Sequence, residues 1–213
     1  MASTPGRGRA VAGLARFPLQ TVRPVDAKQL YAQPRQQLAR LAAGGEVRHV
    51  ANGYYAVVPL AQRGTDWKPT LEAVAAGIAV ATYGPDDVVL MGVSAARIHG
   101  AIPRALGTAV VAIPRQRPAV SLTDRAGTVV FVKRKVDQLD AELMPTDLGR
   151  ALVTTIEQTI VDLAHRPELG NAGADVPAAI RALMARCDRD LLDELAAAQR
   201  LGAARDRAVA MAA

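Results

Sequence analysis

Hydrophobic residues recur at helical spacing in several parts of the chain, most clearly around residue 160. In "TTIEQTIVDLAHRP" the apolar side chains form one broad face that ends before Pro167. Thr154 and Glu157 have the T-x-x-E spacing of a capping box, so we expect a helix over 155–165. Similar patterns predict helices over 70–84, 93–100 and, in two or three segments, 176–211.

Two runs rich in β-branched residues predict strands, "TAVVAIP" over 108–114 and "TVVFVKRK" over 128–135. The basic residues that end the second run indicate an exposed edge, where charge discourages aggregation; a nucleic-acid patch is the alternative. Together with the helices, these strands predict a mixed α/β domain with a helical C-terminus over 70–213.

The first sixty residues predict a different order of elements. Apolar spacing indicates a first helix over 6–17. A second, short helix over 25–32 would be capped by Asp26 and would turn Leu30 inward. After it, Gln33-Pro34 forms a break before a third helix.

The third helix, over about 34–43, is expected to end at Gly44-Gly45, where a left-handed cap is easy. Asn52-Gly53 then favours a type I′ turn, which needs positive φ at both positions, and therefore a hairpin. Three helices followed by a hairpin are typical of a winged helix-turn-helix. We therefore expect an α+β protein with a winged helix-turn-helix domain over 1–60, a linker over 61–69 rich in Pro and Gly, and the second domain over 70–213.

Charge points to the partner of the first domain. Residues 1–70 hold ten Lys or Arg against three Asp or Glu, a net charge of +7, whereas residues 71–213 carry −1. A positive field attracts polyanions, and DNA is the favoured partner. A solvated basic tail is the alternative.

The third helix has one face suited to reading bases. If Leu38, Leu41 and Ala42 face the core, the opposite face is made of glutamine and arginine, which can bond adenine and guanine. The alternative is an ordinary solvated helix face. Arginines of the hairpin and of the N-terminal segment (Arg7, Arg9, Arg16) are expected to contact phosphates. The expected DNA-binding residues are Gln33, Arg35, Gln36, Gln37, Arg40, Arg48 and Asn52.

Recognisable catalytic motifs are missing from the sequence. It has no Walker A loop and no kinase loop set, and Ser94, which could pair with His99, lies outside a G-x-S-x-G context. The three histidines are not spaced as metal ligands, so we expect no metal, no cofactor and no catalytic residue. A single cysteine, Cys187, fits a reducing cytoplasm, and no apolar run is long enough to span a membrane.

The second half resembles the AbiEi family of type IV antitoxins. The resemblance rests on "SAARIHG", "IPRALGTAVVAIPR", "GTVVFVKRK" and "PTDLGRALVTTIEQTIVDLAHRPELG", and the N-terminal "RLAAGGEVRHVANGYYAV" is similar to the family's winged helix. It covers roughly residues 10–170; the stretch after Gly170 does not visibly resemble the family and would be a partner-binding addition. The most distinctive segment has the form T…G…VTT-x-EQT-x-x-D, with Thr146, Gly149, Val153, Thr154, Thr155, Glu157, Gln158, Thr159 and Asp162.

The resemblance implies an antitoxin, encoded beside a nucleotidyltransferase-like toxin, that represses its own operon by binding operator DNA. Gln158 and Asp162 are the candidate surface contacts with a partner. Neutralisation by direct contact, by competition for the toxin's RNA target or by covalent modification remains open, as does the oligomeric state. The alternatives are an enzyme that inactivates the toxin, for instance by phosphorylation, and a ligand-responsive transcription factor.

Overall fold

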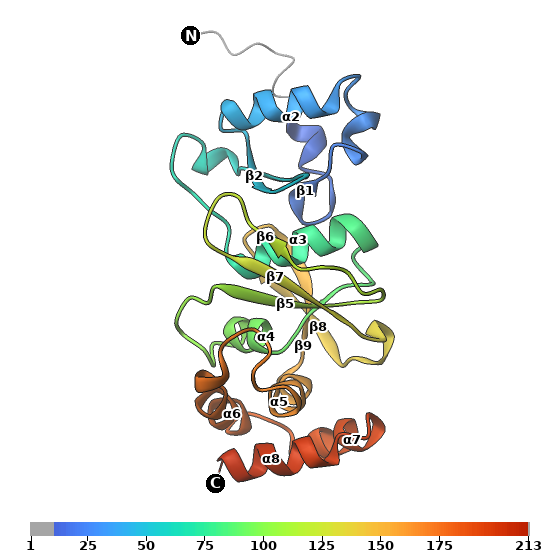
Figure 1. Cartoon of the computed structure of the whole chain (residues 1–213), viewed down its shortest axis with the longest axis vertical. Helices are drawn as coiled ribbons and strands as arrows, with labels where there is room; N and C mark the ends of the chain where they lie inside the picture. Colours follow the sequence, from blue (N-terminus) through green and yellow to red (C-terminus); the bar gives the residue numbers. More distant parts are fainter. Residues whose placement is uncertain (1–10, 213) are drawn as a thin grey trace.

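In the computed structural model, which describes residues 11–212, the elements lie in layers along one axis (Figure 1). A small N-terminal unit with α2 lies at one end, a six-stranded sheet occupies the middle, and the C-terminal helices α5–α8 lie at the other end. The protein is therefore a mixed α+β structure with two sheets and a helical C-terminus, as the sequence predicts.

The N-terminal unit, residues 11–58, is built around a small core of its own. Of the predicted first helix over 6–17, residues 11–14 are helical and residues 15–17 are not, while residues 6–10 lie outside the described residues. Three short strands form a sheet in the order β1-β3-β2. The elements are η1 (Pro18–Gln20), β1 (Thr21–Val22), η2 (Asp26–Gln29), α2 (Pro34–Ala43), β2 (Val47–Ala51) and β3 (Tyr54–Val57). Their core contains Val11, Leu14, Val22, Ala27, Leu38, Leu41, Val47 and Val57.

The second predicted helix is shorter than expected. It is the single 3-10 turn η2, and Leu30 is 42% exposed instead of facing inward. Asp26 does not cap it, because its carboxylate accepts hydrogen bonds from the Arg23 guanidinium at 2.7 and 2.8 Å. The prediction of a capped helix over 25–32 was therefore wrong.

The end of α2 and the hairpin follow the sequence more closely. Gly45 has φ of 73°, and the Glu46 and Gly45 amides donate to Leu41 and Ala42 carbonyls, a Schellman ending. The hairpin β2–β3 forms, but of its two turn residues only Gly53 has positive φ, so the type I′ turn was wrong. The pairing of β2 with β3 shifts register between His49 and Ala51, as at a β-bulge, so the hairpin is not the regular two-residue type that was predicted.

The six-stranded sheet has the order β6-β7-β5-β4-β9-β8. The predicted strands are β5 (Thr108–Ile113) and β7 (Thr128–Lys133), which pair in parallel. Four strands of this sheet were not predicted: β4 (Val89–Leu90), β6 (Val120–Ser121), β8 (Ala141–Thr146) and β9 (Gly149–Thr154). Because β6 pairs only with the beginning of β7, the basic end of β7 extends past it.

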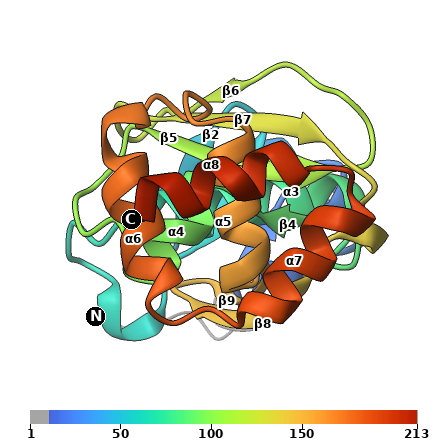
Figure 2. The same ribbon diagram turned by 90° about the horizontal axis from the view of Figure 1, so that it is seen from below.

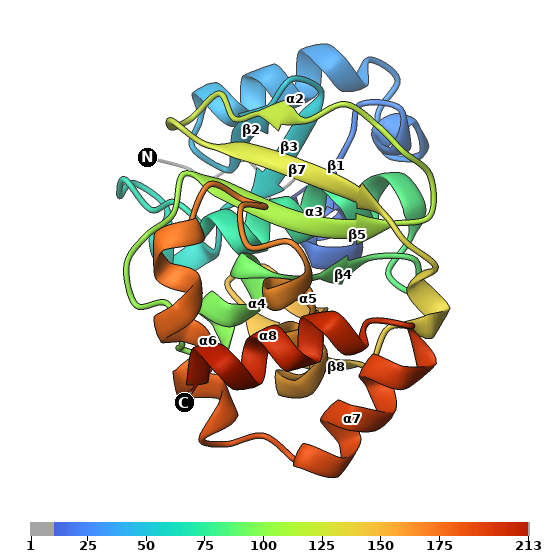
Figure 3. The same ribbon diagram turned by 60° about the horizontal axis from the view of Figure 1, so that its bottom comes forward.

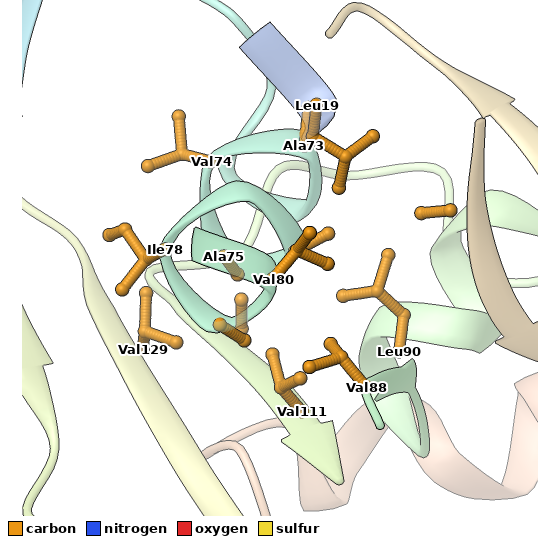
Figure 4. Close-up of a cluster of buried hydrophobic side chains, with 14 of the residues drawn as sticks. Leu19, Ala73, Val74, Ala75, Ile78, Val80, Val88, Leu90, Val111 and Val129 are labelled. Carbon is orange, nitrogen blue, oxygen red and sulfur yellow. The ribbon is translucent and has the colours of Figure 1, made fainter. Parts of the chain in front are cut away.

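Helix α3 (Leu71–Tyr83) lies between the two sheets and is buried over its first ten residues. Figure 4 shows its side chains, with those of Val88, Leu90, Val111 and Val129, in one apolar cluster that also contains Leu19 of the N-terminal unit. A helix buried on nearly all sides needs mostly apolar residues, and "LEAVAAGIAV" supplies them except for Glu72, whose carboxylate accepts a bond from Arg97 at 2.8 Å. Gly77 lets β1 approach closely, since a Cβ there would overlap Oγ1 of the buried Thr21.

The opposite face of the sheet is covered by the remaining helices (Figures 2 and 3). They are α4 (Val93–Ile98), α5 (Ile156–His165), α6 (Val176–Met184), α7 (Arg189–Ala198) and α8 (Gly202–Ala212); η4 (Val136–Gln138) and η5 (Gly173–Asp175) lie in the connections. Figure 2 shows α8 crossing α5, with α6 and α7 on either side. Among residues 11–212, no helix has the length and apolar character that crossing a bilayer requires.

The start of α5 differs from the predicted capping box by one residue. Thr155 is the N-cap and accepts a hydrogen bond from the Gln158 amide at 3.4 Å. Thr154 belongs to β9, and Glu157 instead accepts a bond from the Asp188 amide at 2.8 Å. The glutamate is therefore used to hold α7 against α5.

The N-terminal unit contacts the large sheet through its hairpin. The Thr123 amide and hydroxyl donate to the Val50 and His49 carbonyls, both at 2.9 Å, along the outer edge of β2. The segment 61–69 between the two parts includes the end of η3 (Leu60–Gln62), and its Trp67 packs against the central cluster. The domain limits 1–60, 61–69 and 70–213 stay predictions.

Candidate nucleic-acid interface

A cavity with a volume of about 1070 Å³ lies between the beginning of α2 and the hairpin. Pro34 starts α2 with a fixed backbone, and the hairpin tip lies across from it. The first turn of α2 and the tip of the hairpin therefore border the same groove. Its polar and basic lining residues are Arg23, Lys28, Gln33, Arg35, Gln36, His49, Asn52, Tyr54 and Tyr55.

Four of the seven predicted DNA-binding residues line this groove. Gln33, Arg35, Gln36 and Asn52 do so, and all four are exposed. The other three, Gln37, Arg40 and Arg48, are not among its lining residues: Gln37 is half-buried and Arg40 is exposed, nearer the end of α2. The buried face of α2 is made by Leu38 and Leu41, which leaves glutamine and arginine on the outside as expected.

Arg48 has an acidic neighbour that the sequence did not suggest. Its Nη2 lies 3.4 Å from the Asp66 carboxylate, which also pairs with Lys68 at 3.1 Å. Hydrogen bonding to Lys68, more than to Arg48, lowers the pKa of Asp66. Contact of Arg48 with a phosphate would therefore compete with this exposed pair.

Sequence reasoning missed two aromatic rings in the groove. His49 and Tyr55 are cross-strand neighbours, and their ring centroids lie 4.8 Å apart. Regular pairing around Asn52-Gly53 would have placed Val50 opposite Tyr55, and the register shift between His49 and Ala51 brings His49 there instead, so no signal in the sequence indicated this pair. Arg23 and Lys28 were also missed, because the folded position of the segment before α2 was not predicted. Glu and Asp are absent from the lining of the groove, so its charge is positive.

Gln158 and Asp162 are not surface residues, so their prediction as partner contacts was wrong. Gln158 is 0% and Asp162 3% exposed. Asp162 Oδ1 accepts hydrogen bonds from Arg134 Nη1 and Gln158 Nε2, each at 3.2 Å. Gln199 closes the cluster, with its Oε1 2.9 Å from Arg134 Nη2 and its amide bonded to Gln158. The cluster links α5, the segment after β7 and the end of α7.

Burial dominates the electrostatics of this cluster. It raises the pKa of Asp162 from 3.8 to about 6, although the Arg134 charge and the bonds from Arg134 and Gln158 act in the opposite direction. Oδ2 of Asp162 is buried without a hydrogen-bond partner in the described structure. This carboxylate is therefore held in a site that disfavours its charge.

The remaining candidates for a catalytic or metal site, Ser94 and His99 among them, make structural contacts instead. Ser94 Oγ accepts a bond from the Val110 amide at 2.8 Å, and His99 Nε2 lies 2.7 Å from the Thr154 carbonyl, so the two side chains have separate partners. Within the described part of the chain, His, Cys, Asp and Glu do not gather in any group of three that could hold a metal.

Comparison with known families identifies the second half. The model of the AbiEi antitoxin C-terminal domain matches residues 87–211, more than half of the chain. The chain belongs to the AbiEi antitoxin family. The AbiEi domain runs through α6–α8 to residue 211, so the prediction of a non-family addition after Gly170 was wrong. Membership of this family supports an antitoxin role in a toxin–antitoxin system, which implies a toxin as the partner.

A solved structure gives the same fold over nearly the whole chain. The crystal structure of the RV2827C protein from Mycobacterium tuberculosis aligns with a TM-score of 0.60 and 21% sequence identity, covering 99% of this AbiEi protein and 82% of the other chain. At this identity the likeness concerns the fold. A comparison with curated protein sequences found no significant match.

Proposed function

We propose that the N-terminal unit is a winged helix-turn-helix that binds operator DNA, and that this cytoplasmic antitoxin represses its own operon while counteracting a nucleotidyltransferase-like toxin. The observation that carries the DNA-binding part is the shared groove of α2 and the hairpin. Its lining is basic and rich in amides, and it contains the exposed Gln33, Arg35, Gln36 and Asn52.

The geometry favours the beginning of α2 for base reading. In helix-turn-helix proteins the N-terminal residues of the recognition helix contact base edges in the major groove. Arg35 and Gln36 occupy that position here, and their side chains suit guanine and adenine. Arg40 lies more than a turn further along α2, outside the groove, and is expected to contact a phosphate instead.

Fluorescence anisotropy with duplex DNA from upstream of the protein's own gene tests this assignment. Arg35→Ala should weaken operator binding by about 1–3 kcal/mol and leave binding to unrelated DNA nearly unchanged, because it removes a base contact. Arg40→Ala should weaken both. Arg181→Ala, on the exposed face of α6, is the matched control. Equal losses on both DNAs for Arg35→Ala would show that it does not read bases.

The antitoxin part is tested by growth rescue. The product of the neighbouring gene is induced alone, with the full chain, and with full-chain Arg35→Ala. Full rescue by the variant would show that antitoxicity does not need operator binding. Loss of rescue would mean that repression contributes to protection, and a harmless neighbour would refute the proposed toxin.

A further inference from the structure

A second cavity lies at the opposite end of the molecule from α2. Its volume is about 680 Å³, and it is bordered by the end of β7, the end of α5, and the corner between α7 and α8. Figure 1 shows these helices below the sheet, and Figure 2, seen from below, shows them in front of it. Its volume falls within the range of small-molecule sites, about 300–1,000 Å³.

One wall of this cavity is strongly basic. Its lining holds no Asp or Glu, and its six basic residues come from three separate parts of the chain: Lys133, Arg134, Lys135, His165, Arg166 and Arg200. Among the ion pairs of the described residues, Arg134 alone of these six has a carboxylate partner. The pKa of His165 is lowered by burial and then by the charges of Arg134, Arg166 and Arg207. The cavity therefore has a concentrated positive field.

Arg134 is held in place before any ligand arrives. Its two terminal nitrogens bond to Asp162 and Gln199, and its side chain remains 23% exposed. The buried polar cluster beneath the cavity thus fixes one cation at its wall. Pre-organised cations bind anions at a smaller entropic cost than flexible ones.

Arg200 occupies a backbone position that favours glycine. It has φ of 59°, in the left-handed region, directly after α7 and its C-cap Gln199. An arginine at such a position carries backbone strain, and strain of this kind is concentrated at functional sites. The Arg200 and Leu201 amides donate to the Ala197 and Ala196 carbonyls, so this position ends α7, and the Arg200 side chain lines the cavity.

One helix end reinforces the positive field. Helix α8 begins at Gly202, directly after the lining residue Leu201, so the positive end of its dipole lies at the rim. The C-terminal end of α5 would oppose an anion, but the carbonyl of Ala164 accepts a bond from Arg207 Nε at 3.1 Å. The remaining wall is apolar and consists of Val132, Leu195, Ala198 and Leu201.

We propose that this cavity binds a nucleoside polyphosphate, with its phosphates on the basic residues and its nucleoside against the apolar wall. A wall of cations beside a wall of aliphatic side chains fits a ligand with one anionic and one weakly polar end. The site is independent of the operator-binding groove, from which it is separated by the sheet.

Titration of the full chain with the fluorescent analogue methylanthraniloyl-ATP tests the proposal. ATP and inorganic tripolyphosphate should displace the probe, and adenosine should not. Lys133→Ala should weaken binding about tenfold, the usual effect of one charge-assisted hydrogen bond. Arg200→Gly should weaken it similarly without lowering the melting temperature, because glycine relieves the backbone strain; a merely structural arginine would not show this combination. The control Arg181→Ala on α6 removes one positive charge, as each of these variants does, and should bind the probe as the wild type does.

Three results would overturn the proposal. The first is absence of probe binding at roughly millimolar concentration. The second is unchanged affinity in both Lys133→Ala and Arg200→Gly. The third is displacement of the probe by a short single-stranded RNA at concentrations well below those of ATP, which would make the cavity a nucleic-acid site.

Discussion

The buried carboxylate of Asp162 makes an unusual prediction for stability. Its folded-state pKa is about 6, against 3.8 for an ordinary aspartate. A group with a raised folded pKa binds more protons in the folded than in the unfolded state between these values. Its contribution to stability is therefore fully present below pH 3.8 and is lost as the pH rises through 6, opposite to an aspartate whose ion pair lowers its pKa.

The magnitude follows from the two pKa values. A factor of ten in an acid constant equals about 1.4 kcal/mol, so the full displacement corresponds to about 3 kcal/mol. About 2 kcal/mol of this falls between about pH 4.5 and pH 7.5, where titration is practical. Asp162→Asn removes the titration and keeps an oxygen that can accept from Arg134 and Gln158.

Urea unfolding of both proteins across this pH range measures the effect. The free energy of unfolding of the wild type minus that of Asp162→Asn should fall by about 2 kcal/mol from about pH 4.5 to pH 7.5. Taking the difference removes the titration of every other group. Asp137→Asn, at an exposed site, is the matched control. A constant difference would refute the raised pKa, and a rising one would show that attraction to Arg134 outweighs burial.

Three further substitutions test the packing of the fold by the same unfolding measurement. Gly77→Ala should destabilise the protein by about 1–3 kcal/mol, because the new methyl group overlaps Thr21. The control Gly202→Ala, with open space around it, should not destabilise the protein. Equal effects would refute the close approach of β1 and α3. Thr155→Ala should cost about 1 kcal/mol by removing the cap of α5, and no loss would refute the capping contact. Ile160→Ala should cost about 2–5 kcal/mol, since its side chain is completely buried; a loss below this range would show that the core collapses around it.

Strong local patterns made most helices and two strands predictable. The limits of α3, α5, β5 and β7 differ by at most two residues from those expected, since each has a long apolar run with a clear end. The unpredicted strand β8 has exposed or half-buried side chains on both of its faces, so its sequence lacks the alternation of apolar and polar residues that marks a strand. It also contains Pro145, which an edge strand tolerates. Such a strand exists because β9 pairs with it, and pairing is not visible in local sequence.

The candidate sites also differ in whether local sequence or the contact of distant segments determines them. The exposed face of α2 followed from helical periodicity, and so did Gln33, Arg35 and Gln36 in its groove, whereas Asn52 came from the predicted hairpin. The burial of Gln158 and Asp162 could not be predicted from periodicity, because polar residues on a helix normally face water. Their partners Arg134 and Gln199 are 28 and 41 residues away, and the fold alone brings them together.

The burial of these residues changes what the most recognisable segment means. Thr154, Gln158, Thr159 and Asp162 belong to the EQT segment that carries the family resemblance, and all four are buried. Thr154 and Thr159 bond to each other through their hydroxyls at 2.8 Å, while Gln158 and Asp162 hold Arg134 at the wall of the basic cavity. The segment therefore specifies how α5 joins the sheet and positions a cation, and any direct contact with a partner would use exposed residues elsewhere. Substitutions in this segment that abolish antitoxicity would report on folding or on the cavity, and only a measured stability and ligand affinity can distinguish the two.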